Sequence, residues 1–252
     1  MSRILGAVSD RPFPPSLLLA FRVLAESGRT PRDFGCPQPD PKAGHPDGWG
    51  IACIGEGEEV YRRGALKATA DPAYEEAAKA VGRLVNPPFL LLAHVRRSPK
   101  RDEIRTDFSH PFRREVSGRR VFFAHDGMCE GFGVRDRKTD SMALFDRILE
   151  SLGPTQRDAT EFKQASAQAK AAIDAEFPRK VTSYTFAMID GDRLVAHRDA
   201  RTCVPYHALH EAKRDGLSIV CSEVLEGFEG KWRLLRNGEL LVVAGMRERP
   251  RP

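Results

Sequence analysis

Short apolar runs near both ends of the chain predict β-strands, because runs of about four to eight apolar residues between turn residues suit buried strands. The dipeptides Asp190-Gly191 and Asn237-Gly238 lie between such runs, as β-hairpins require. The segment Gly55-Glu56-Gly57-Glu58 separates another pair. The expected strands are residues 2–8, 49–54, 59–63, 89–96, 121–125, 183–190, 193–197, 217–221 and 239–243.

Helical patterns occupy the middle of the chain and a segment near its start. Pro14-Pro15-Ser16 opens a helix that should end near Glu26, and Thr139-Asp140-Ser141 is a typical helix start. Further helices are expected at residues 72–84 and 157–177. This order of strands, central helices and strands predicts an α+β fold, with antiparallel sheets and helices packed outside them.

The chain has 252 residues, of which 41% are hydrophobic and 30% charged, a composition typical of globular proteins. This length suits one large domain, which we expect over residues 1–246, with a flexible tail at 247–252. Residues 29–48 are rich in proline and should form a loop, long enough to suspect a function.

Several features point to a location inside the cell. The longest aliphatic run, residues 90–93, is far shorter than the roughly 20 residues of a membrane span, so no membrane partner is expected. The first residues lack the basic and apolar parts of a secretory signal. The five cysteines are scattered and form no Cys-x-x-Cys pair, so a disulfide framework and a zinc knuckle both fit poorly. Together these features predict a protein of the reducing cytoplasm.

Charge and histidine content disfavour two further kinds of site. The chain carries 40 Lys and Arg against 35 Asp and Glu, and arginines gather in residues 96–105 and 113–120. No Tyr or Trp interleaves these segments, so a solvated face is favoured over a nucleic-acid groove. Four histidines lack the helical spacing or carboxylate cluster of a metal site, so we expect no metal and no cofactor. They are His45, His94, His110 and His125.

Short motifs stand at the ends of the expected strands and in loops, and each is weak alone. They are Met1-Ser2-Arg3-Ile4-Leu5-Gly6, Asp47-Gly48-Trp49-Gly50-Ile51-Ala52, Ala93-His94-Val95-Arg96, His110-Pro111-Phe112, Phe123-Ala124-His125-Asp126-Gly127, Thr139-Asp140-Ser141 and Cys221-Ser222-Glu223. In this order and spacing, over essentially the whole chain, they resemble the class II glutamine amidotransferases, and more narrowly the single-domain group without an attached synthetase. The resemblance implies the fold of N-terminal-nucleophile hydrolases, a four-layer αββα sandwich of two mainly antiparallel sheets flanked by helices.

The resemblance also implies an activity, the hydrolysis of the side-chain amide of glutamine or a related amide. Ser2, exposed by removal of Met1, would be the nucleophile, and its own α-amine would be the base. The backbone N–H of Gly127 and the side chain of Asp126 occupy the positions of the family's oxyanion hole. The released ammonia could pass to a synthetase partner.

Further residues are implied to bind the substrate. Arg96 would bind the α-carboxylate of glutamine, a task suited to a planar guanidinium, and Asp140 would bind the α-ammonium. His94 and the segment Gly48-Trp49-Gly50 complete this set. From the residues alone, Arg96 could instead be a surface arginine, and Asp140 could serve as a helix cap without binding substrate.

Two positions depart from the family pattern. The family nucleophile is cysteine, whereas Ser2 carries a hydroxyl that ionises far less readily and depends on the α-amine for activation. Asp126 stands where the family has asparagine, and an ionised carboxylate would oppose the developing oxyanion. Three outcomes stay open: glutamine hydrolysis, hydrolysis of another amide or ester, and a catalytically silent protein that binds an amino acid or a partner protein.

Overall fold

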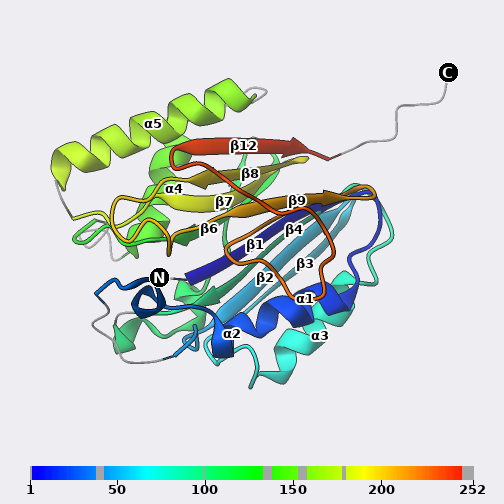
Figure 1. Cartoon of the computed structure of the whole chain (residues 1–252). Helices are drawn as coiled ribbons and strands as arrows, with labels where there is room; N and C mark the ends of the chain where they lie inside the picture. Colours follow the sequence, from blue (N-terminus) through cyan, green and yellow to red (C-terminus); the bar gives the residue numbers. More distant parts are fainter. Residues whose placement is uncertain are drawn as a thin grey trace.

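Two β-sheets packed face to face, with helices on both outer faces, form the described part of the chain (Figure 1). The computed structural model describes residues 2–37, 43–98, 100–132, 138–152, 158–177 and 180–245. The expected tail at 247–252 lies outside the described residues. The α+β sandwich expected from the sequence is confirmed.

The larger sheet has seven strands in the order β11-β9-β10-β1-β4-β2-β3, and its strand pairs are antiparallel. All residues of β1 and β4 are buried, as expected for apolar strands at the centre of a sheet. The strands are β1 (Ser2–Ser9), β2 (Trp49–Gly55), β3 (Glu58–Gly64), β4 (Phe89–Arg96), β9 (His210–Arg214), β10 (Leu217–Cys221) and β11 (Arg233–Leu234).

The smaller sheet has five strands in the order β12-β8-β7-β6-β5, again antiparallel. Its strands are β5 (Phe112–Val116), β6 (Arg119–Asp126), β7 (Thr185–Asp190), β8 (Arg193–Arg198) and β12 (Glu239–Ala244). Side chains alternate between the two faces of a strand, so Ile4 of β1 contributes to the core between the sheets, whereas Leu5 faces the outer helices.

The helices form the two outer layers of the sandwich (Figure 1). The first three pack on the larger sheet, and the last two pack on the smaller sheet. They are α1 (Pro15–Arg22), α2 (Leu24–Ser27), α3 (Pro72–Val81), α4 (Asp140–Ser151) and α5 (Ala159–Glu176), with short 3₁₀ turns η1 (Pro31–Phe34), η2 (Arg101–Glu103) and η3 (Thr106–Phe108).

Three strands were not predicted, namely β5, β9 and β11. They are rich in charged residues and lie at or next to sheet edges, where one face of a strand can stay in solvent. The arginine-rich segment 113–120 forms the hairpin of β5 and β6. Arg113 and Arg120 both pair with Glu59 of β3, at 3.0 and 2.8 Å.

The antiparallel arrangement brings the start of β1 next to the end of β4. Ser2 is paired with Arg96 in the register of these strands. The end of β6, in the other sheet, reaches the same place, because the main-chain nitrogen of Ser2 contacts the side chain of Asp126. Three strand ends from two sheets therefore meet at one edge of the sandwich.

Candidate active site

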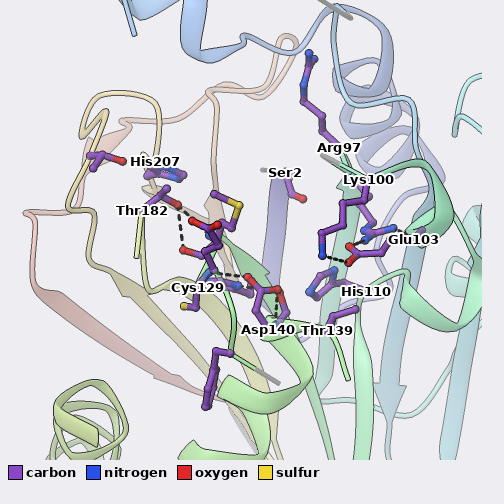
Figure 2. A pocket seen from close by; sticks show the side chains of 18 of the residues that line it. Ser2, Arg97, Lys100, Glu103, His110, Cys129, Thr139, Asp140, Thr182 and His207 are labelled. Carbon is purple, nitrogen blue, oxygen red and sulfur yellow. Dashed lines mark hydrogen bonds and ion pairs between the residues drawn. The ribbon is translucent and has the colours of Figure 1, made fainter. Parts of the chain in front are cut away.

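Ser2 lines a pocket of about 270 Å³ at this edge. The pocket is bordered by strand ends and by loops from both halves of the chain. Figure 2 shows Ser2 between His207 on one side and Lys100, Glu103 and His110 on the other. Ser2 is only 3% exposed, so a molecule that reaches its hydroxyl must enter the pocket.

Asp126 connects Ser2 with a histidine from a distant loop. Its Oδ1 accepts a hydrogen bond from the main-chain nitrogen of Ser2 at 2.6 Å, and its Oδ2 accepts one from His207 Nδ1 at 2.8 Å. Asp126 is fully buried, and His207 is 2% exposed. Removal of Met1 would turn the Ser2 nitrogen into an α-amine, so Asp126 is placed to contact the amine expected to act as base.

The pKa of Asp126 lies well below its usual range. Burial raises it, but the neighbouring His207, which donates a hydrogen bond to the carboxylate, and the buried guanidinium of Arg3 both lower it, and the lowering effects prevail together. Arg3 is also fully buried, and its guanidinium donates to the Ser2 carbonyl oxygen at 2.9 Å. Asp126 is therefore a carboxylate at neutral pH, held in a buried set of polar groups around Ser2.

Arg96 is a buried pocket residue rather than a surface arginine. Its guanidinium donates to the Glu103 carbonyl oxygen and lies 3.4 Å from the Glu103 carboxylate. Glu103 also pairs with Lys100 at 2.9 Å. Lys100 and Glu103 both line the pocket, so Arg96 belongs to a cluster of charged side chains that could bind the charged end of a substrate.

Asp140 lines the same pocket as the first residue of α4. The N-cap of this helix is Thr139, whose hydroxyl accepts from Met142 N at 3.2 Å, so Asp140 is not the cap. Its carboxylate accepts from Cys129 N and from Ser141 N, both at 2.7 Å. These bonds fix the carboxylate and join the helix to the segment after β6.

Gly127 follows Asp126 and also lines the pocket. A β-carbon at this position would collide with the carbonyl oxygen of Ser183, so the close approach of the two chains requires glycine. His125 is held by Ser141 Oγ at 2.9 Å and Ser183 O at 3.0 Å. The backbone at Gly127 is thus fixed on both sides, as a preorganised donor would need.

The family model of the class II glutamine amidotransferases matches residues 33–212. The chain belongs to this family. No curated protein matches the sequence significantly.

Solved structures of this kind share the fold. The Bacillus subtilis glutamine phosphoribosylpyrophosphate amidotransferase, complexed with ADP and GMP, aligns with a TM-score of 0.63 and 13% identity over 98% of this chain and 50% of that one. A glutamine aminotransferase class-II domain protein from Silicibacter pomeroyi aligns with a TM-score of 0.59 and 20% identity over 96% of this chain and 97% of that one. A predicted glutamine amidotransferase from Pseudomonas aeruginosa aligns with a TM-score of 0.51 and 18% identity over 97% of both chains. The chain thus spans about half the length of the Bacillus enzyme, and it has the N-terminal-nucleophile hydrolase fold.

The remaining residues that the family resemblance suggested lie beside the pocket rather than in its lining. Trp49 packs in the core against Tyr74, and its indole donates to Asp71 at 2.8 Å. A β-carbon on Gly50 would collide with the His110 carbonyl oxygen, while Gly48 has a φ of 129° that other residues rarely adopt. These positions shape the backbone next to the site.

His110 lines the pocket and His94 lies next to it outside the lining, with ring centroids 4.3 Å apart. Burial lowers the pKa of His94 to about 3 and holds that of His110 well below its usual value. Both rings are therefore neutral at neutral pH. Among the described residues, no group of three or more His, Cys, Asp or Glu side chains is arranged to hold a metal ion.

The loop after β8 supplies residues that sequence reasoning missed, chiefly Tyr206 and His207. No motif surrounds them, and only the fold brings them to Ser2. The Arg3 guanidinium lies 4.2 Å from the centroid of the Tyr206 ring, which orders this loop against β1.

One expectation about cysteine was wrong. Cys36 and Cys203 form a disulfide that joins the proline-rich loop to the loop carrying His207, because the fold brings together two cysteines 167 positions apart. Cys53, Cys129 and Cys221 are free and buried. Within the described part of the chain, no helix has the length and apolar character of a membrane span. The cytoplasmic location stays a prediction.

Proposed function

We propose that this protein binds glutamine, or a closely related amino acid amide, in the Ser2 pocket and hydrolyses its side-chain amide. The observation that carries the proposal is the convergence of Ser2, Arg96, Gly127 and Asp140 on one pocket. These residues come from four separate parts of the chain, and together they provide a nucleophile, a cation, a backbone donor and an anion.

The proposed reaction follows the chemistry of an N-terminal nucleophile. After Met1 is removed, the Ser2 hydroxyl attacks the amide carbon, and its proton moves to the Ser2 α-amine. The carbonyl electrons move onto oxygen, which the backbone N–H of Gly127 stabilises. The ammonium then returns its proton to the amide nitrogen, and ammonia leaves. Water hydrolyses the resulting ester and releases glutamate.

Arg96 and Asp140 would hold the two charged ends of the amino acid. A guanidinium binds a carboxylate through paired hydrogen bonds, and a carboxylate accepts from an ammonium. Ammonia release also raises the question of an acceptor. Family membership supports a synthetase partner that consumes ammonia, and we include such a partner in the proposal.

The test is glutamate release from glutamine by the purified protein. Intact mass first establishes whether Met1 is removed. The wild type should release glutamate, Ser2→Ala should release none, and an acyl-enzyme adduct should appear in the mass spectrum of the wild type only. Retention of Met1, or equal rates for the wild type and Ser2→Ala, would refute the proposal.

A second candidate function rests on Asp126. The family has an asparagine at this position, and the aspartate replaces an amide donor with a carboxylate. A protein that binds glutamine without hydrolysing it would fit this change. Calorimetric binding of glutamine without any glutamate release would favour this second function.

A further inference from the structure

The carboxylate of Asp126 faces Ser2 in a way that the family comparison does not explain. Its two oxygens are divided between the Ser2 nitrogen and His207 Nδ1, at 2.6 and 2.8 Å. All three groups are buried. The carboxylate therefore makes a short contact with the atom that becomes the α-amine, and the histidine holds it there from the other side.

We infer that Asp126, held in place by His207, makes the α-amine of Ser2 a stronger base and so allows a hydroxyl to replace the thiol as nucleophile. This inference rests on the proposed function. Asp126 acts through the amine and does not touch the substrate, so it is a positioning residue. His207 positions Asp126 in turn.

The physical reason lies in the proton that the attack releases. A hydroxyl holds its proton far more tightly than a thiol, so its attack depends more strongly on the base. When the α-amine takes the proton of Ser2 Oγ, it becomes an ammonium ion in contact with the Asp126 carboxylate. An adjacent opposite charge stabilises the charged form of a group. The aspartate of a Ser-His-Asp triad supports its histidine in the same way.

The other charged groups around Ser2 are held by ion pairs or by hydrogen bonds to the backbone; Arg97, for example, donates to the Gly44 carbonyl oxygen at 2.8 Å. Arg3 contacts Glu223 at 2.5 Å, and Arg96 lies 3.4 Å from Glu103. Asp140 is held by backbone N–H groups. Burial lowers the pKa of three histidines near Asp126, so they are uncharged at neutral pH. They are His45, His94 and His125. Tyr206, also facing this set, has its pKa raised by burial and stays neutral.

The two departures from the family pattern are then one coupled change. Serine at position 2 needs a stronger base, and aspartate at position 126 provides it. An ionised Asp126 would oppose an oxyanion if its carboxylate oxygens lay close to the developing negative charge. In this structure both of its oxygens are instead engaged with Ser2 N and His207.

The experiment measures the titration midpoint of the Ser2 α-amine directly. Protein whose mass shows Met1 removal is labelled with ¹³C,¹⁵N-serine, and the Ser2 resonances, assigned by their loss in Ser2→Ala, are followed against pH. The wild type should titrate above the usual range of roughly 7.7–8.0. Asp126→Asn should lower the midpoint by about one pH unit or more. Asp190→Asn, which changes a buried carboxylate at the far end of β7, should leave it unchanged.

A wild-type midpoint inside or below the usual range would overturn the inference, even if Asp126→Asn did not fold. Equal midpoints in the wild type and a folded Asp126→Asn would also overturn it. The pH dependence of glutamate release separates the two proposals. A raised midpoint without glutamate release would refute the proposed function alone, whereas glutamate release with an ordinary midpoint would refute this inference alone.

Discussion

The main-chain nitrogen of Ser2 lies 2.6 Å from Oδ1 of Asp126, although 124 positions separate the two residues. β1 and β6 belong to different sheets, so this contact depends on how the sheets stack. It places the Asp126 carboxylate at the nitrogen of the residue that we propose as the nucleophile. Position 126 should therefore affect the base more than the oxyanion hole, and mutations at positions 2 and 126 should show strong coupling.

A double-mutant cycle tests this coupling. With Ser2 present, Asp126→Asn should lower kcat by roughly 10²-fold, the lower end of what a positioned base contributes. With Ser2→Cys, the same change should cost less than tenfold or should raise kcat, because a thiol needs less help and an amide can donate to the oxyanion. The measurement is glutamate release by the wild type, both single variants and the double variant.

If the Asp126 carboxylate instead opposed the oxyanion, as the sequence suggested, Asp126→Asn would raise the rate with either nucleophile. If the aspartate lowers the rate equally with serine and with cysteine, its carboxylate acts on the oxyanion and our account of the base is wrong.

A second prediction concerns His207, which contacts Asp126 but has no assigned contact with substrate. His207→Leu removes the donor to Oδ2 and should lower kcat by about tenfold, while His207→Gln keeps a donor and should restore most of the rate. Thermal unfolding of both variants serves as the control. Equal losses in the two variants, at equal stability, would show that the donor to Asp126 does not matter.

A third prediction concerns substrate binding by Arg96. Arg96→Lys keeps the charge but removes the planar fork, so KM for glutamine should rise by about 10-fold or more, with a smaller change in kcat. The matched control is Arg62→Lys on β3, an exposed arginine whose guanidinium donates to the Tyr61 carbonyl oxygen. A fall in kcat at unchanged KM would contradict the assigned role.

The sequence predicted the central strands best. Residues 89–96 are mostly apolar, and they make a strand buried on both faces with the expected bounds. Residues 217–221 were placed equally well. Strands β9 and β11 were missed because their charged residues alternate with few apolar ones, and their pairing with neighbours decides their conformation.

The site was predictable as a set of residue types but not as a set of contacts. The motifs identified Ser2, Arg96, Gly127 and Asp140, which line the pocket. They could not show which way the Asp126 carboxylate points. His207 carries no local signal, because its contact with Asp126 spans 81 positions and depends on the path of the loop after β8.

A fourth prediction concerns stability in acid. Burial lowers the pKa of five buried histidines, to about 3 for His94 and His197. Unfolded histidines bind a proton below about pH 6.5, whereas a folded histidine with a lowered pKa binds it only at lower pH, so stability is lost as pH falls below about 6.5. For His94 and His197 this loss continues toward pH 3. The five are His45, His94, His110, His125 and His197.

Urea unfolding at pH 7, 6 and 5 measures this loss. The free energy of unfolding should fall steeply over this interval. His197 lies on β8 and outside the pocket lining. His197→Phe should reduce the slope of the free energy of unfolding against pH by the amount that corresponds to about one bound proton. A free energy that stays constant between pH 7 and pH 5 would show that the buried rings are not held neutral.

A fifth prediction concerns the disulfide between Cys36 and Cys203. Under non-reducing denaturing conditions, three of the five cysteines should react with a thiol reagent, and all five should react after reduction. Reduction should lower the free energy of unfolding by roughly 2–5 kcal/mol, because the bond closes a long loop. Reductant should not affect the Cys36→Ser, Cys203→Ser double variant, which is the control. Because Cys203 lies four positions before His207, reduction should also loosen the support of Asp126 and lower kcat. Five reactive thiols before reduction would refute the bond.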